Sequence, residues 1–247
     1  MYRLAILLLL CAAPLQAHDL TARCHASSSW DVTLEAPTGL VFDRTGPAPT
    51  RVDWNAGVLR VDGAAVALGA EGEDRMALFE RELRALAPRV RQVARHSLDL
   101  AAATLREEVG TLTLDPATWS AFDTRLGQHV DALRRQIDAS RSTHDWQGDA
   151  VTSTLQRMAG DLLPLVAGAL GQQALDAAMR GDLAGAQRLQ GEAADLASRL
   201  RPAVEARLTT LQPEVDALCP AVRRLAALQD GVRDGAGRAL DLLDVEP

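Results

Sequence analysis

The sequence predicts an α+β fold that is predominantly helical, in which a small N-terminal antiparallel β-meander is followed by a bundle of long amphipathic helices. Three observations support this prediction. Apolar residues alternate at every second position in residues 28–70, and they recur at steps of three and four from residue 71 onward. The change follows a hairpin signal at Asp62-Gly63. A thin sheet exposes one apolar face, so the helix launched from its last strand is expected to cover that face.

Four or five short strands are expected. Val32 and Leu34 alternate with polar neighbours in residues 30–36, and "TGLVFD" and "TRVDWNAG" supply the next two strands. The clearest hairpin is "VLRVDGAAVAL", in which Asp-Gly suits a tight turn because both positions of that turn need positive φ. Such a sheet is too small to hold a core of its own.

The helices follow from apolar stripes. The first stripe comprises Met76, Phe79, Leu83, Leu86, Val90 and Val93. Pro88 predicts a kink or a new start near residues 86–89.

The next helix is expected to begin at Asp115 and Pro116, the first as its N-cap and the second in its first turn. A third helical region spans about residues 150–175 and a last one about 196–225; prolines at 202, 213 and 220 predict that the last is kinked or split. Periodicity alone does not decide whether these apolar helix faces pack against one another within one chain or between chains.

The first residues indicate export. Arg3 precedes an apolar run, Leu4–Leu15, which has the length of a signal-peptide core and is too short to span a bilayer. Ala17 is the expected cleavage point, so residues 1–17 are a signal peptide and the mature chain begins near His18. Bulky Leu10 precedes Cys11, so lipidation is not expected. The predicted domains are therefore the meander, residues 18–70, and the helical bundle, residues 71–247, packed together as one structural unit of a periplasmic protein.

Composition excludes one class of partner. The formal charge is −7, and all 26 basic residues are Arg. An acidic chain without a basic run lacks the electrostatic footprint of a nucleic-acid binder.

Two cysteines, Cys24 and Cys219, remain after cleavage, and in an oxidising compartment they are expected to form a disulfide. The closed loop of roughly 195 residues corresponds to at most roughly 5 kcal/mol in the chain-entropy description. The rival interpretation, two free thiols or a metal pair, needs partner residues that neither cysteine has in sequence.

Several of these features occur together in a known family of proteins. The signal peptide, the early Cys24, "GVLRVDGAAVAL" directly followed by "RMALFERELRALAPRVRQVA", and the ending "EVDALCPAVRRLAALQDGVR" resemble the YggN-like family of bacterial exported proteins. The resemblance implies a periplasmic location and the strand-then-helix layout. That family is itself of unknown function, so the resemblance assigns no catalytic residue.

Candidate chemistry is sparse. "HDLTARCH" places His18 and His25 near the mature N-terminus, where an amine and imidazoles could hold copper or zinc. His96, Ser97 and Asp99 are neighbours on a helix and point in different directions, so they cannot form a relay by themselves. His129 is expected at a core edge and His144 in a solvated loop. We found no nucleophile elbow, phosphate loop or H-E-x-x-H motif, and assign no catalytic residue, cofactor or metal.

The apolar patch "LLPLVAGALG", Leu162–Gly171, permits two interpretations. It is either a helix buried on most sides or a glycine-loosened segment that opens to hold a hydrophobic client or touches a membrane surface. We therefore expect a non-enzymatic binding or structural protein of the cell envelope, whose partner is another envelope protein or a hydrophobic client. The alternatives are an enzyme, such as a hydrolase, with an unrecognised site, and a metal-handling protein that uses His18 and His25.

Overall fold

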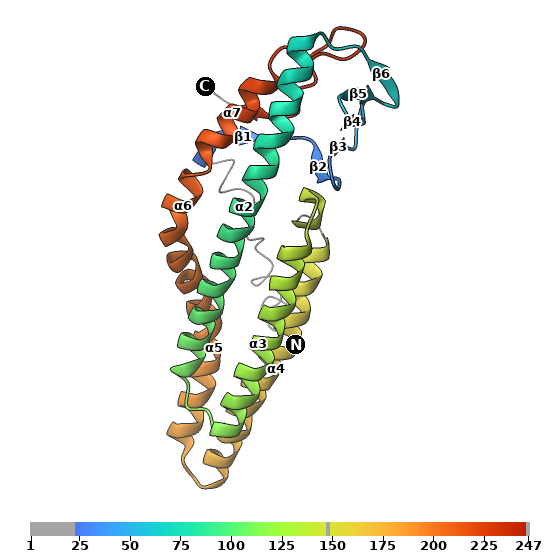
Figure 1. The fold of residues 1–247 in the computed structure, drawn as a ribbon. Helices are drawn as coiled ribbons and strands as arrows, with labels where there is room; N and C mark the ends of the chain where they lie inside the picture. Colours follow the sequence, from blue (N-terminus) through green and yellow to red (C-terminus); the bar gives the residue numbers. More distant parts are fainter. Residues whose placement is uncertain (1–22, 147–148, 246–247) are drawn as a thin grey trace. The chain divides into compact units, whose positions relative to one another are not determined.

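The computed structural model describes residues 23–146 and 149–245 (Figure 1). The predicted fold class is confirmed, because a five-stranded antiparallel sheet comes first and long helices follow it. The expected signal peptide and His18 lie outside the described residues. The strands are β1 (Ala26–Ser27), β2 (Asp31–Leu34), β3 (Leu40–Asp43), β4 (Arg51–Asn55), β5 (Val58–Val61), β6 (Ala64–Val66) and β7 (Asp244–Val245). The helices are α2 (Ala70–Gly110), α3 (Pro116–Ala139), η1 (Thr143–Trp146), α4 (Asp149–Met179), α5 (Leu183–Leu208), η2 (Thr209–Leu211), α6 (Gln212–Asp216) and α7 (Cys219–Gln229).

The sheet is a meander with the order β2-β3-β4-β5-β6, and each strand pairs with its neighbour in sequence. Two tight turns set its register. Ala56 and Gly57 have φ of 49° and 78° between β4 and β5, and Asp62 and Gly63 have φ of 47° and 82° between β5 and β6. Both central positions of each turn are thus left-handed, as the sequence predicts for Asp62 and Gly63.

The predicted covering of the sheet by the following helix is confirmed. Leu40, Phe42, Val52, Trp54 and Leu59 of the strands are buried in one core with side chains of two helices. These residues are Met76, Phe79 and Leu86 of α2, Leu218 directly before α7, and Cys219, Val222 and Leu225 of α7. The sheet alone buries too little apolar surface, so α2 and α7 complete its core.

Contacts divide the chain into two compact units. The sheet unit contains described residues 23–93, 139–146 and 213–245, and the helix unit contains 94–138 and 149–212. This grouping differs from the boundary expected between residues 70 and 71, because the first half of α2 shares a core with the strands while its second half shares one with α3, α4 and α5. Each unit therefore has its own hydrophobic core.

Within the helix unit, α4 and α5 run side by side and meet at a short turn (Figure 1). The core contains Phe122 and Leu126 of α3, Leu162 and Leu170 of α4, and Leu196 of α5. The apolar faces of these helices therefore pack against one another within one chain in this unit. The predicted N-cap is confirmed, since Asp115 Oδ1 accepts hydrogen bonds from the backbone N–H groups of Ala117 and Thr118 at 3.0 Å.

Prolines inside the helices do not end them. Pro88 lies within the continuous helix α2, so the predicted new start near residues 86–89 is wrong. Pro164 and Pro202 likewise lie inside α4 and α5. An interior proline costs about 3 kcal/mol, and the packing of neighbours such as Leu86 in the core offsets that cost. The predicted split of the last helical region is confirmed at Pro213 and Pro220, which lie in the first turns of α6 and α7.

Candidate functional site

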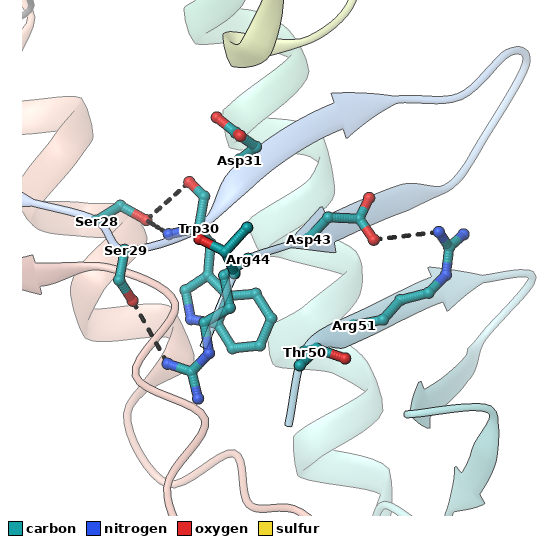
Figure 2. A pocket seen from close by; sticks show the side chains of 9 residues that line it. Ser28, Ser29, Trp30, Asp31, Asp43, Arg44, Thr50 and Arg51 are labelled. Atoms are coloured by element: carbon teal, nitrogen blue, oxygen red, sulfur yellow. Dashed lines mark hydrogen bonds and ion pairs between the residues drawn. The ribbon is translucent and has the colours of Figure 1, made fainter. Parts of the chain in front are cut away.

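A hollow lies in the sheet unit, beside the ends of β2, β3 and β4 (Figure 2). Its volume is about 520 Å³. Its wall is mostly polar and consists of Ser28, Ser29, Trp30, Asp31, Asp43, Arg44, Thr45, Thr50 and Arg51. We name it the strand-end hollow.

One side of the strand-end hollow is built on Trp30. The Arg44 guanidinium lies 4.1 Å from the centroid of the Trp30 ring, a cation–π contact, and its Nε donates to the Pro49 carbonyl at 2.8 Å. Trp30 is only 4 % exposed, and its indole N–H donates to the Asp241 carbonyl at 3.2 Å. The pair therefore joins the start of the sheet to the C-terminal segment.

The opposite side contains Arg51 between two carboxylates. Arg51 reaches Asp53 at 2.7 Å and Asp43 at 3.1 Å (Figure 2 draws the pair with Asp43). The hydrogen bond with Asp53 and the charges of both carboxylates raise the pKa of the Arg51 guanidinium above its usual value. The two arginines of the wall, Arg44 and Arg51, are thus balanced by Asp31 and Asp43, so the hollow has no excess charge to select an ion.

The predicted disulfide is present. Cys24 and Cys219 are bonded at 2.02 Å, and both side chains are buried in the core of the sheet unit. Cys24 in this state offers no thiolate to a metal, which removes one ligand from the "HDLTARCH" cluster. Across residues 23–146 and 149–245, no three His, Cys, Asp or Glu side chains lie close enough together to hold a metal ion.

Two residues of the groups singled out in sequence, Asp99 and His144, lie next to ionisable side chains. Asp99, beside His96 and Ser97, accepts a hydrogen bond from Arg134 of α3 at 2.6 Å and so belongs to an ion pair between helices. His144 Nδ1 lies 3.5 Å from Asp31, and its side chain is exposed as predicted, but the residue belongs to the short helix η1 and not to a loop.

His129 is half-buried on α3, which confirms its predicted place at the edge of a core. Its Nε2 lies 3.1 Å from Asp161 of α4, and Arg125 reaches the same carboxylate at 2.6 Å. The hydrogen bonds from His129 and Arg125 lower the pKa of Asp161. These bonds explain the group as a polar contact between two helices, and no hydroxyl or thiol is hydrogen-bonded to it among the described residues.

Helix α4 has an exposed face without charge, which we name the α4 outer face. The exposed residues of this face are Gly160, Pro164, Ala167, Gly168, Gly171, Gln172, Leu175 and Met179. Asp161 is the one charged residue between Arg157 and Asp176, and it is paired with α3. The opposite side of the helix, including Leu162, Val166 and Leu170, is buried. The interpretation of the apolar patch as buried core therefore holds for one side of the helix, and the other side is exposed.

The α4 outer face ends at the hairpin between α4 and α5. Leu175 is 54 % exposed, Met179 71 % and Leu183 66 %. Two glycines here are required by the turn and by the cap of α5. Gly181 has φ of 82°, and a Cβ on Gly185 would lie 2.1 Å from Asp182 Oδ2, the carboxylate that caps α5.

Sequence patterns missed the strand-end hollow, because its wall comes from three strand ends that only pairing brings together. The α4 outer face had a signal in sequence, since residues 162–175 contain no charged side chain. The periodicity did not reveal that one side of that stretch is exposed.

The fold and these surfaces define a disulfide-linked α+β protein, mostly helical, with an uncharged exposed helix face. Residues 24–237 match the model of a family described as "Protein of unknown function (DUF2884)", and the chain belongs to that family. No curated protein and no solved structure matches the chain. Within residues 23–146 and 149–245, no helix is long and apolar enough to cross a membrane.

Proposed function

We propose that this protein is an exported, periplasmic, YggN-like protein without enzymatic activity, and that it binds an apolar helical segment of another envelope protein along the α4 outer face. The observation that carries the proposal is the exposure of Leu175, Met179 and Leu183 at the end of an uncharged helix face. Large apolar side chains gathered on one exposed surface are typical of an interaction site.

The glycines of α4 support a helical partner. A Cβ added at Gly160, Gly168 or Gly171 would meet nothing within 4 Å, so packing within the chain does not require these glycines. Each costs a helix about 1 kcal/mol relative to Ala. Small residues on an exposed face let the backbone of another helix approach closely, and the partner's contacts would offset this cost.

Export rests on the first 17 residues and on the disulfide. A leader with an apolar core directs a chain out of the cytoplasm, and a disulfide between Cys24 and Cys219 is typical of an oxidising compartment. The periplasm is the compartment that joins both features in a bacterium.

Photo-crosslinking in living cells tests the proposed partner. A photoreactive residue at Met179 or Leu175 is expected to give one adduct with a specific envelope protein. The same residue at Gln128, an exposed position of α3, is expected to give none. An adduct with lipid or with a second copy of the chain would contradict the proposal, and so would equal adducts from Gln128.

Glycine substitutions separate binding from stability. Gly168→Ala and Gly171→Ala are expected to raise the stability of α4 by up to about 1 kcal/mol each while they reduce the Met179 adduct. Gly127→Ala on α3 is the matched control, since a Cβ there also meets nothing within 4 Å. An undiminished adduct in the Gly168 and Gly171 variants would show that no helix approaches this face closely.

A further inference from the structure

Another hollow of the sheet unit has three arginines in its wall, and we name it the arginine hollow. It has a volume of about 290 Å³ and lies where the end of β2 meets α2 and the segment before η1. The charged residues of its wall are Arg84, Arg91, Arg141 and Glu35, and the apolar ones are Leu34, Ala36, Ala87 and Pro88.

Arg84 is held in place by three acceptors. Its Nε donates to Glu80 at 2.8 Å, and its Nη2 donates to the carbonyls of Glu35 at 2.7 Å and Gly39 at 2.8 Å. These bonds fix the guanidinium at the wall and leave its Nη1 without a partner among the described residues. A guanidinium that is already ordered loses little side-chain entropy when it binds a ligand.

The other two arginines have more donors to offer. Arg91 uses Nη2 to donate to the Ser140 carbonyl at 2.5 Å, and its Nε and Nη1 have no partner within the described chain. The backbone of Arg141 is fixed, since its carbonyl accepts from the Leu34 N–H at 2.8 Å and its N–H donates to Asp145 at 3.0 Å. No hydrogen bond or ion pair to a described residue engages its guanidinium.

The wall of the arginine hollow has more positive than negative side chains. It carries three arginines and one carboxylate, Glu35, which forms no ion pair with a described residue. Two further carboxylates lie next to the wall: Glu80 pairs with Arg84, and Asp145 accepts from the Arg141 backbone N–H. Neither of them engages the free guanidinium donors of Arg91 and Arg141, whereas in the strand-end hollow Asp43 already pairs with Arg51. An anion is the ligand that this arrangement favours.

The number of arginines and the volume of the hollow indicate which class of anion would fit it. One guanidinium fork suffices for the two oxygens of a carboxylate, whereas three guanidiniums, two from α2 and one from the segment before η1, suit the three terminal oxygens of a phosphate monoester. The volume is that of about ten water molecules, more than one phosphate group needs. The apolar side chains of the wall suit an organic substituent on that group.

We propose that the arginine hollow binds a phosphate monoester, with Arg91 and Arg141 as its principal ligands and Arg84 as a third donor held by Glu80. The site does not depend on the partner proposed for α4, because it lies in the other unit. The phosphate can belong to a soluble metabolite or to the head group of an anionic lipid, and both sources present the same chemistry to the arginines.

Calorimetry of the purified mature protein tests the proposal, with glycerol 3-phosphate as the soluble probe. Cosedimentation with phosphatidylcholine vesicles, with and without phosphatidic acid, tests the lipid source. Saturable binding in either arm that weakens as salt is raised supports the site, and the arm that binds identifies the source. Glycerol is expected not to bind. Equal affinity for acetate would overturn the choice of phosphate, and binding in neither arm would overturn the site.

Variants assign the binding to these residues. Arg91→Gln and Arg141→Gln are each expected to weaken binding at least tenfold, and Glu35→Gln to tighten it. Arg81→Gln, at an exposed arginine of α2 outside the wall, is the matched control and should bind as the unmodified protein does. An equal loss in Arg81→Gln would mean non-specific attraction to positive charge. Wild-type affinity in both the Arg91 and Arg141 variants, with unchanged circular dichroism, would refute the assignment.

Discussion

The indole N–H of Trp54 donates to a carboxylate oxygen of Glu80 at 3.1 Å, which ties β4 to α2 inside the core of the sheet unit. The second oxygen of Glu80 accepts from the Gly39 backbone N–H and from Arg84 Nε, both at 2.8 Å. One side chain therefore joins the helix to two parts of the meander, and Trp54 is only 3 % exposed.

Glu80→Ala is expected to lower the free energy of unfolding of the sheet unit by about 2–3 kcal/mol, because the N–H groups of Trp54 and Gly39 lose their acceptor. Chemical denaturation followed by Trp fluorescence measures the loss. Asp74→Ala is the control, since this exposed carboxylate of α2 has no hydrogen-bond or ion-pair partner among the described residues, and it should change stability by less than about 0.5 kcal/mol. Equal effects of the two substitutions would contradict the role of Glu80.

Stability should depend on pH through the same carboxylate. Burial alone would raise the pKa of Glu80, but the hydrogen bonds from Gly39, Arg84 and Trp54 and the Arg84 charge outweigh it and hold the pKa below the ordinary 4.5. A group whose pKa is lowered in the folded state stabilises the protein above its unfolded pKa, and this contribution is lost as the pH falls through the folded value. The stability difference between wild type and Glu80→Gln should therefore be largest near pH 7 and shrink below about pH 4.5. A difference that is constant from pH 7 to pH 3 would contradict the assignment.

Loss of the disulfide is expected to destabilise the sheet unit strongly. The Cys24→Ser/Cys219→Ser variant should lose up to roughly 5 kcal/mol, because the sequence separation of 195 residues makes the loop closure costly in the unfolded chain. Denaturation with and without reductant measures the effect, and the double variant should not respond to reductant. Mass spectrometry of the exported protein provides the second check: alkylation of both cysteines without reductant would refute the bond.

Residues 160–191 are expected to exchange amide hydrogens faster than Phe79–Val93. Gly160, Gly168 and Gly171 weaken α4 and its outer face is exposed, whereas the first half of α2 is packed against the sheet. Hydrogen exchange read by mass spectrometry compares the two segments within one sample. Equal protection would show that α4 and the start of α5 are as stable as the helix that covers the sheet.

The cap of α5 permits a double-mutant test. Asp182 Oδ1 accepts from the Gly185 N–H at 2.8 Å, so Asp182→Ala should cost about 1 kcal/mol. Gly185→Ala should also destabilise, since its Cβ would lie 2.1 Å from Asp182 Oδ2 and displace the cap. Once the carboxylate is gone the Ala no longer clashes, so the double variant should be more stable than the sum of the single losses predicts. Additive losses would contradict the proposed clash.

Much of the fold follows from local pattern. The turn at Asp62-Gly63, the stripe beginning at Met76 and the cap at Asp115 were predictable because each depends on residues close in sequence. The new start predicted at Pro88 is wrong, because a proline's local cost is visible in sequence and the core contacts that offset it are not.

The candidate sites were less predictable. The strand-end hollow and the arginine hollow join segments that are distant in the chain, such as Arg91 and Arg141, and no spacing rule relates them. The same limit applies to the contact between His129 and Asp161, since either residue alone is an ordinary polar position on a helix.

The sequence by itself determined the order of strands and helices, the turn chemistry and the expected pairing of Cys24 with Cys219, because periodicity, backbone conformation and cysteine number are properties of the chain. Only the tertiary structure decided which side of α4 is exposed and which arginines surround a hollow. Burial and charge at a site are sums over neighbours, and the fold alone selects those neighbours.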